Sequence, residues 1–345
     1  MSGKEERRLA NHKPKDTDFL TISARVRIFE TRLLTDEQLG QVLDARSNAD
    51  AVKLLQEHGY PELDPSNPEK LDEALSAVRL ATMEDLSIGM PDLRYLDLFR
   101  IKYDYHNVKA LLKAKAMGVP PDRMLLDMGR VGVETLKKAV SGDGRPEELL
   151  PPQLALSLAE ASDILETTRD PQLSDMALDR GYYKDLASLA DEINSDFLRE
   201  WIRGQIDAAN LRVLVRTLRM GKGLPFLSGA LFEGGAIPRE SVLAAAENGA
   251  AGLDALYRDT PLRDAAEAGA AALSGGPLTE FEKRCDNAAE ARLRDAKYVP
   301  FGEEPVLRYL AARETEYTNL RIVLTGRQAG IEPDVIRARL RESAL

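Results

Sequence analysis

The stretch "ETEYTNLRIVLTGRQAG" at residues 314–330 carries a pattern that occurs twice more in this 345-residue chain, in "QIDAANLRVLVRTLRMG" at 205–221 and in "KYDYHNVKALLKAKAMG" at 102–118. Each copy has an acid three residues before an Asn, a basic residue two after the Asn, and a Gly eleven after it. We call this pattern the motif frame. Its members are Asp104, Asn107, Lys109 and Gly118 in the first copy, Asp207, Asn210, Arg212 and Gly221 in the second, and Glu316, Asn319, Arg321 and Gly330 in the third.

The motif frame returns at a nearly constant interval. Asn107 and Asn210 lie 103 residues apart, and Asn210 and Asn319 lie 109 residues apart. This spacing indicates an internal triplication, and the long periodic stretches with few alternating β-branched runs indicate helices. We therefore predict an all-α protein of three similar helical-bundle domains. The predicted boundaries are 1–17 for an N-terminal extension and 18–129, 130–237 and 238–345 for the domains.

Each motif frame is predicted to lie on a helix with a defined end. The acid and the Asn share one helical face with the aliphatic positions four and five residues after the Asn. A Gly followed within a few residues by Pro predicts the end, because Gly adopts the left-handed cap conformation and Pro prevents continuation. The second copy continues as "GKGLP", whose additional Gly223 raises the expectation of a different cap there. Near the start of the chain, Thr35 with Gln38 three residues later predicts a capped helix start.

Composition and charge limit the classes of partner. The chain has 57 acidic and 47 basic residues and a formal net charge of −10, which opposes binding to nucleic acid or to anionic lipid. No apolar run approaches the roughly 18 residues that span a bilayer, and the first residues lack the apolar core of a signal peptide. The single Cys285 excludes an internal disulfide. We expect a cytoplasmic protein with no nucleic-acid partner and no direct lipid insertion.

Sequence signatures of enzymes are absent. "MGKGLPF" contains Gly-Lys but lacks the spacing of a phosphate-binding loop. His12, His58 and His106 are scattered without paired spacing, and Cys285 lies among charged residues with no nearby His. We therefore predict no catalytic, cofactor or metal site.

Asp175 and Asp179 in "DPQLSDMALDRGYYKDL" are the best remaining chemical candidates. Lying four residues apart, they could share a helical face and hold a divalent ion or divide acid and base roles. The structural interpretation, which we favour, is that Asp175 begins a helix while Asp179 pairs with Arg180 or faces solvent.

The motif acids and Asn residues also allow two interpretations. A carboxylate and an amide recurring three times could surround a pseudo-threefold ligand site. We favour a structural role, in which each acid and Asn tie their helix to a neighbouring backbone and the motif cation pairs with an acid elsewhere. Trp201, with Phe197 four residues before it, is likewise interpreted as core.

These segments carry a resemblance to a known family. The motif frames, "RVRIFETRLL" near the start and "LPPQLALSLAEASDILETTRDPQLSDMALDRGYY" in the middle resemble the C subunit of the A/V-type rotary ATPases and ATP synthases, which is called the d subunit in eukaryotic vacuolar enzymes. The resemblance runs from about residue 18 to the C-terminus. It implies a non-catalytic, funnel-like arrangement of three helical domains around a pseudo-threefold axis.

The same resemblance implies the partners. Such a protein is seated on the cytoplasmic end of the membrane rotor ring, receives the foot of the central shaft and transmits torque, while ATP chemistry and H⁺ or Na⁺ passage belong to other subunits. We expect a monomer when the chain is isolated, with no cofactor of its own.

Two other classes stay open from the residues alone. One is a helical-repeat adaptor or scaffold of another complex, and the other is an all-α enzyme using scattered carboxylates. Intervals above 100 residues are much longer than the roughly 33–47 of common helical solenoids, which weakens the adaptor. The missing motifs weaken the enzyme.

Overall fold

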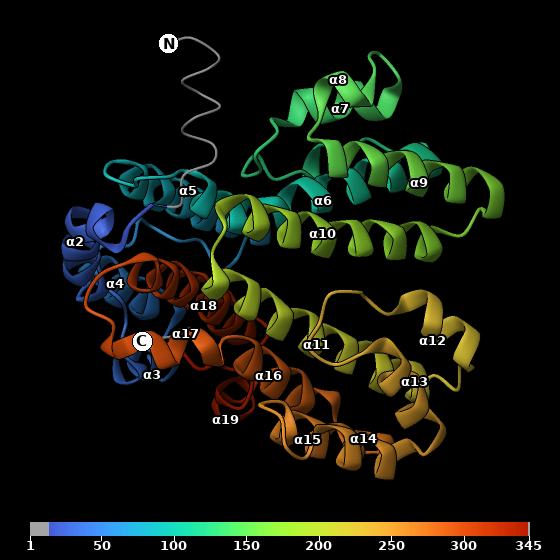
Figure 1. The fold of residues 1–345 in the computed structure, drawn as a ribbon. Coiled ribbons are helices and arrows are strands. Elements are labelled where there is room, and N and C mark those ends of the chain that lie inside the picture. The colour runs from blue at the N-terminus through green and yellow to red at the C-terminus, as the bar shows by residue number, and fades with distance from the viewer. Residues whose placement is uncertain (1–13, 344–345) are drawn as a thin grey trace. The chain divides into compact units, whose positions relative to one another are not determined.

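A computed structural model describes residues 14–343, and within that range the chain forms helices and no strand (Figure 1). The all-α class is confirmed. Of the predicted extension 1–17, residues 1–13 lie outside the described residues, as does His12. The elements are η1 (Asp16–Phe19), α2 (Leu20–Glu30), α3 (Asp36–Leu43), α4 (Asn48–Glu57), α5 (Pro68–Ser87), α6 (Arg94–Met117), η2 (Asp122–Met124), α7 (Val133–Ser141), α8 (Pro146–Leu149), α9 (Pro152–Thr168), α10 (Pro171–Ile193), α11 (Asp196–Arg219), α12 (Leu224–Ala230), α13 (Arg239–Glu247), α14 (Gly249–Tyr257), α15 (Arg263–Leu273), α16 (Leu278–Ala289), α17 (Ala291–Asp295), η3 (Ala296–Tyr298), α18 (Glu303–Gln328) and α19 (Pro333–Arg337).

The predicted helix start at Thr35 is confirmed. The Thr35 hydroxyl accepts a hydrogen bond from the Gln38 backbone N–H at 3.2 Å, and the Gln38 side chain accepts one from the Thr35 N–H at 2.9 Å. This reciprocal pair satisfies two of the N–H groups that the first turn of α3 leaves without helical partners. At the start of α5, Asn67 accepts from two backbone N–H groups and Pro68 takes the first helical position, where no N–H is needed.

The three motif helices α6, α11 and α18 end in the same way. Gly118, Gly221 and Gly330 have φ angles of 67°, 65° and 67°, in the left-handed region. In each case the residue after the Gly donates its N–H to the carbonyl five residues earlier, and the Gly donates to the carbonyl three residues earlier. This double closure is the Schellman motif. The expectation of a different cap in the second copy was wrong, because Gly223 lies beyond the closure.

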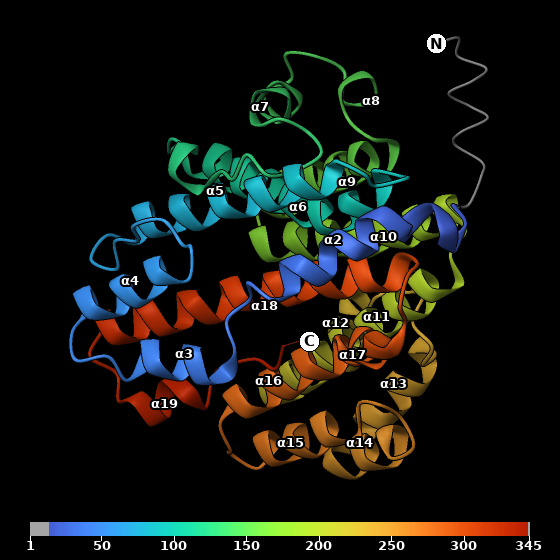
Figure 2. The ribbon, with the colours of Figure 1, turned by 90° about the vertical axis from the view of Figure 1, so that its left-hand side faces the viewer.

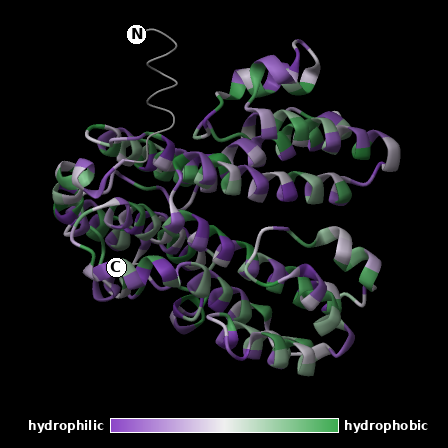
Figure 3. Ribbon diagram, viewed as in Figure 1, coloured by the Kyte–Doolittle hydropathy of each residue, from purple (hydrophilic) through white to green (hydrophobic). Residues whose placement is uncertain are grey.

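The chain separates into two compact units, which we describe individually. Among the described residues, the first contains 92–206 and 229–239, and the second contains 14–91, 207–228 and 240–343. The boundary falls within α11. Hydrophilic and hydrophobic positions are interspersed along the helices (Figure 3). The division into domains at 18–129, 130–237 and 238–345 stays a prediction.

In the first unit, α6 packs against the pair formed by α9 and α10, with α7 on its other flank. Trp201, at the start of α11, is 6% exposed and its ring stacks on Phe99 of α6 with 5.8 Å between centroids. The core interpretation of Trp201 is therefore confirmed. The helices α9 and α10 approach closely at Gly181. A Cβ at this position would lie 2.0 Å from the Ser157 hydroxyl of α9, so a larger residue would not fit without a shift.

In the second unit, the last long helix packs against the first helices of the chain. The helix α18 contacts α2, α3, α4 and α5 (Figure 2). Apolar side chains of α3, α4, α5, α18 and α19, with two from the segment after α4, form one buried cluster, which joins residues about 250 positions apart in sequence. The members of this cluster are Leu39, Val42, Leu43, Ala51, Leu55, Tyr60, Leu63, Leu71, Leu75, Tyr317, Leu320, Val323, Leu324 and Ile336.

The second motif helix has its own partners in this unit. The helices α14, α15 and α16 pack in sequence order, and Gly269 of α15 lies so close to α11 that an added Cβ would be 2.9 Å from the Val215 side chain. Val215 is one of the aliphatic positions that follow the motif Asn, and it is fully buried. The apolar side of the second frame therefore faces the interior, as the helical spacing predicts.

The left-handed conformation at the helix ends can be tested by a substitution that does not change side-chain packing. A Cβ added at Gly118 meets no atom within 4 Å, so Gly118→Ala introduces only the backbone cost of a left-handed conformation. We expect the free energy of unfolding to fall by about 1 kcal/mol, measured by urea denaturation. Gly204→Ala is the matched control, because Gly204 lies inside α11 with equally open space and should gain about 0.5–1 kcal/mol. Equal effects at the two sites would contradict the cap assignment.

Candidate functional site

The first motif frame ties α6 to the loop that follows η2. The Asn107 side chain donates to the Leu126 carbonyl at 2.7 Å and accepts from the Leu126 N–H at 2.9 Å. Asp104 accepts from the Val131 N–H at 3.1 Å. Both side chains have no exposed surface. The loop can approach only because Gly129 lacks a side chain, since a Cβ there would lie 2.1 Å from an Asp104 oxygen.

The third motif frame makes the same kind of contacts with different partners. Asn319 donates to the Arg341 carbonyl at 2.9 Å and accepts from the Arg341 N–H at 2.8 Å. Glu316 accepts from the Leu34 N–H at 2.9 Å and from the Tyr60 hydroxyl. An amide side chain carries a donor and an acceptor, so each Asn pairs with both the N–H and the carbonyl of one residue, as a neighbouring strand would.

The acids of the two frames hold equivalent points of the chain. Val131 lies two residues before α7 begins, and Leu34 lies two residues before α3 begins. In both copies the carboxylate therefore holds the backbone just before the first turn of a short helix, α7 in the first copy and α3 in the third. The helix α7 comes after the motif helix and η2, whereas α3 comes from much earlier in the chain than its motif helix.

The cation of each frame reaches an acid on a neighbouring helix. Lys109 of α6 pairs with Asp179 of α10 at 2.5 Å. One turn further along α6, Lys113 pairs with Asp175, which lies one turn before Asp179 on α10, also at 2.5 Å. Arg321 of α18 pairs with Asp72 of α5 at 2.7 Å.

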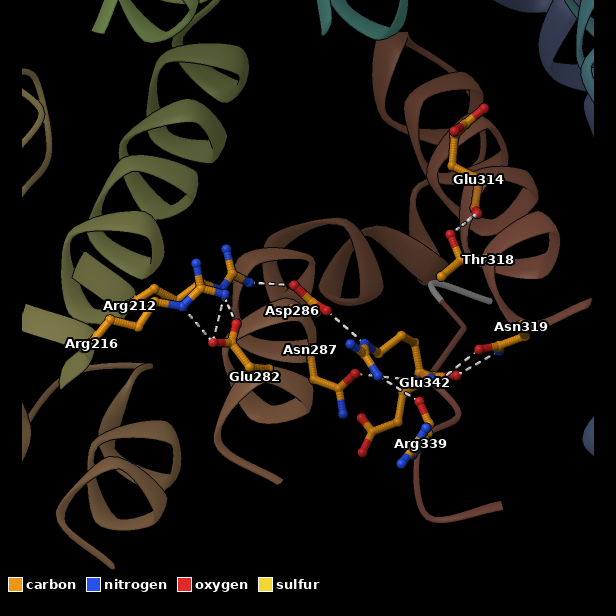
Figure 4. Close-up of polar contacts among 11 residues, drawn as sticks. Arg212, Arg216, Glu282, Asp286, Asn287, Glu314, Thr318, Asn319, Arg339 and Glu342 are labelled. Atoms are coloured by element: carbon orange, nitrogen blue, oxygen red, sulfur yellow. Dashed lines mark hydrogen bonds and ion pairs between the residues drawn. The ribbon is translucent and has the colours of Figure 1, made fainter. Parts of the chain in front are cut away.

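The second frame repeats the doubled arrangement. Arg212 pairs with Asp286 of α16, and Arg216, one turn later, pairs with Glu282, one turn earlier, at 2.7 Å (Figure 4). The reversed order of the pairs is that of antiparallel helices. These pairs are partly exposed, so each contributes only about 0.2–1 kcal/mol, and their main effect is to select one helical register. The acid and amide of this frame, Asp207 and Asn210, are buried like their counterparts.

The two carboxylates singled out as a chemical candidate are balanced by lysines of α6, as described above. The Asp179 side chain is 44% exposed, as one of the two alternatives expected, but the helix start at Asp175 and the pairing with Arg180 were wrong. Asp170, rather than Asp175, precedes α10 and accepts from a first-turn N–H at 2.8 Å. Arg180 pairs with Glu160 at 2.7 Å instead of with Asp179. The Asp-Pro pair at 170–171 is the sequence signal that identifies this helix start.

Arg130 is a polar residue of the first unit that sequence reasoning missed. It donates to Asp104 at 2.8 Å and to both oxygens of Asp185 on α10, at 2.7 and 3.2 Å. Tyr105 also donates to Asp185, at 3.2 Å. This network links α6, the loop and α10 at a buried point. No spacing rule connects its members, because they come from three elements.

Burial dominates the electrostatics of the motif acids. It raises the pKa of Asp104 above its ordinary value, against the opposing effect of Arg130. It likewise raises the pKa of Glu316, against the effects of Arg313, Tyr60 and the Leu34 N–H. In both cases the loss of water disfavours the charged carboxylate more than the nearby donors stabilise it.

The C-terminal segment lies between α16 and α18 in the second unit (Figure 4). Besides its backbone pairing with Asn319, Arg341 donates to Asp286 at 2.5 Å, the acid that also pairs with Arg212. The next residue, Glu342, donates its N–H to the Asn287 side chain at 3.1 Å. Asp286 therefore connects the second motif helix to the segment that follows the third.

The remaining residues considered from sequence do not form a catalytic arrangement. Cys285 is buried, which raises the pKa of its thiol to about 12 and disfavours the reactive thiolate. His106 contacts the Met124 carbonyl at 3.0 Å, and His58 lies in the other unit. Across residues 14–343, no three His, Cys, Asp or Glu side chains are grouped so as to hold a metal ion. In the same range, no helix has the length and apolar character needed to cross a bilayer.

Together these features define a helical protein built on three copies of one motif helix, in which buried polar contacts hold neighbouring segments in place. The family model of the ATP synthase (C/AC39) subunit matches residues 22–339, and the chain belongs to this family. The predicted resemblance is confirmed.

Curated relatives match over nearly the whole chain. The C subunit of the V-type ATP synthase of Thermus thermophilus is 28% identical, with 89% of this chain and 93% of the relative covered. The C subunit of the V-type sodium ATPase of Enterococcus hirae is 22% identical, with 94% and 98% covered. The C subunit of the A-type ATP synthase of Haloferax volcanii is 26% identical, with 92% and 96% covered.

The Asn contacts can be tested at Asn107. Replacement by Leu preserves the approximate size but leaves the N–H and carbonyl of Leu126 without partners, so we expect a loss of about 2 kcal/mol or more in the free energy of unfolding. Asn48→Ala removes a hydrogen bond that solvent can replace and should cost less than about 0.5 kcal/mol. Urea denaturation of both variants measures the difference. A loss at Asn107 no larger than at Asn48 would show that this pairing is not a stabilising tie.

The raised pKa of Glu316 predicts a specific pH dependence. The folded state binds a proton at Glu316 more readily than the unfolded state, so this contribution to stability is full below the ordinary value of 4.5 and is lost as pH rises through the raised pKa. Glu316→Gln has no such titration. We expect the wild-type free energy of unfolding, relative to the variant, to be larger at about pH 4.5 than at about pH 7.5. A difference that stays constant or grows with pH would contradict this.

Proposed function

We propose that this chain is a non-catalytic central-stalk subunit of a V/A-type ATPase or ATP synthase. It forms a socket that links the central rotor shaft to the membrane rotor ring and transmits torque for ATP-coupled proton or Na⁺ transport. The observation that carries the proposal is the family match across 22–339, together with relatives named as the C subunit of such complexes. The chain sits at the cytoplasmic face of the membrane, held there by the ring rather than by lipid.

The motif frames support a role in bearing load. A part that transmits torque must resist sliding between its helices, and apolar packing alone is non-directional. Each described contact is directional: an Asn pairs with the N–H and carbonyl of one residue, an acid holds the segment that leads into a helix, and a cation selects a helical register. In α6 and α18 these contacts lie within about three turns of the helix, and in α11 the described contacts are those of Arg212 and Arg216.

The proposal includes three equivalent domains in a pseudo-threefold, funnel-like arrangement. Its support is the shared geometry of the three frames, namely the same Schellman cap and the same pairing of the motif cation with a neighbouring helix. Three similar bundles provide a seat that a shaft can enter along one axis. The domains proposed are those predicted from the interval of the frames.

The test is to prepare the rotary complex with and without this chain. Complexes lacking the chain should hydrolyse ATP but not move ions, because the shaft has lost its seat, and adding back the purified chain should restore coupling. ATP hydrolysis and ion flux into vesicles are the measurements. The chain alone should sediment as a monomer and hydrolyse no nucleotide. Normal ion pumping by complexes shown by mass spectrometry to lack the chain would overturn the proposal.

A further inference from the structure

The helices that surround the third motif helix come from a distant part of the chain. The helix α18 packs against α3, α4 and α5 (Figure 2), although Ser87, the last residue of α5, lies 216 positions before Glu303, the first residue of α18. The first motif helix, α6, packs instead against α7, α9 and α10, which follow it in sequence. We call α18 with α3, α4 and α5 the third bundle, and α6 with α7, α9 and α10 the first bundle.

Two members of the motif frame contact corresponding helices in these bundles. The motif acid accepts the N–H two residues before a short helix, which is α7 in the first bundle and α3 in the third. The motif cation pairs with an acid of a long helix. That acid is Asp179 of α10 in the first bundle, and it is Asp72 of α5 in the third.

A third contact follows the same correspondence. The basic residue eight positions after the motif Asn donates to a carbonyl at the end of the short helix, where the last carbonyls lack helical partners. Lys115 donates to the Val140 carbonyl near the end of α7 at 2.9 Å. Arg327 donates to the carbonyl of Leu43, the last residue of α3, and to that of Ala45 at 2.9 Å. The helix α3 therefore corresponds to α7, and α5 corresponds to α10.

The two bundles differ in how these contacts are connected along the chain. In the first bundle, Leu126 and Val131, which pair with the motif Asn and the motif acid, lie five residues apart in one loop. In the third bundle the corresponding residues are Arg341 and Leu34, which belong to distant segments. The contact of the acid spans 27 residues in the first bundle and 282 in the third. Closing the longer span costs more chain entropy.

We propose that residues 34–87 and 303–343 form one bundle, held together without a covalent connection between Arg341 and Leu34, and that this bundle opens as a unit while the first bundle stays closed. We call the break between these two residues the seam. The helices α3, α4 and α5 separate from α18 together, because they share one apolar cluster with it. The interval of the motif frames alone groups these helices with α6, whereas their contacts group them with α18. The proposal rests on these contacts and is independent of the proposed function.

The connections of the chain explain why opening occurs at the seam. In the first bundle, α6, α7, α9 and α10 follow one another, so short connections keep each helix near the next after a contact breaks. In the third bundle, α3 to α5 are joined to α18 only through residues 88–302. The side chains of Arg321 and Asp72, which link α18 to α5, are 59% and 40% exposed, so this ion pair contributes little to closure. Such groups of helices are the units in which folded proteins open locally.

Hydrogen exchange of the full-length chain, followed by mass spectrometry at increasing urea concentrations below global unfolding, tests the opening. We expect peptides from 36–87 and from 316–328 to lose protection at the same urea concentration. Peptides from 94–117 and 152–193 should need a higher concentration. Loss of protection in 36–87 together with 94–117 rather than with 316–328, or simultaneous loss in all four segments, would overturn the proposal.

A circular permutant tests the seam by making the third bundle continuous. The first variant joins residue 345 to residue 1 through a flexible linker of about 15 Gly and Ser residues and begins at Asp92, after α5. The matched control has the same linker but begins at Gly144, in the exposed turn between α7 and α8, so it divides the first bundle. We expect protection of 36–87 to rise roughly five- to tenfold in the first variant, because the paired segments become closer in sequence. In the control, protection of 152–193 should fall.

The two permutants also separate this grouping of helices from the one given by the motif interval. If α3 to α5 belonged with α6, a start at Asp92 would divide their bundle and lower the helix content measured by circular dichroism below that of the control. That result, or unchanged protection of 36–87 in the first variant, would contradict the seam. If both permutants lose helix content, the urea experiment decides, because it uses the chain in its natural order.

Discussion

The pairing of a buried Asn with both backbone groups of one residue, its N–H and its carbonyl, is the contact on which the described fold depends most directly. Helices satisfy their own backbone, but the connecting segments do not, and a connection brought against a helix must find partners for its N–H and carbonyl groups. Asn107 and Asn319 supply those partners from the helix side. The acids three residues earlier accept one more N–H. Asp104 holds the same loop as Asn107, whereas Glu316 holds Leu34, in a different segment from the one that Asn319 contacts.

The local features were predictable because they depend on few residues. Thr35 and Gln38 identified a capped start, and the three glycines identified helix ends, since only neighbouring residues decide those conformations. The buried state of the motif acids and amides also followed from their spacing relative to the aliphatic positions. The prediction for the second cap was wrong because it assumed that Gly223 takes part in the helix end. Gly221 alone adopts the left-handed conformation that completes the Schellman motif.

The partners of those residues were not predictable in the same way. The sequence interpretation expected each acid and amide to tie a helix to a neighbouring backbone, but nothing in the chain marks Leu126, Val131 or Leu34 as the segments involved. Arg130 and Asp185 meet only because α10 packs against α6. The packing of α18 against the first helices is likewise a property of the complete chain, because no spacing rule relates positions about 250 residues apart.

That packing has a consequence for biosynthesis. Leu39, Leu43 and Leu55 are synthesised more than 250 residues before their buried neighbours Leu320 and Leu324. At roughly 5–20 residues per second, the apolar side of the first helices waits on the order of ten to fifty seconds for its partner. The helices α6 to α10 meet their neighbours much sooner, since they are close in sequence. The helices α6 to α10 can therefore pack while the apolar sides of α3, α4 and α5 are still without α18.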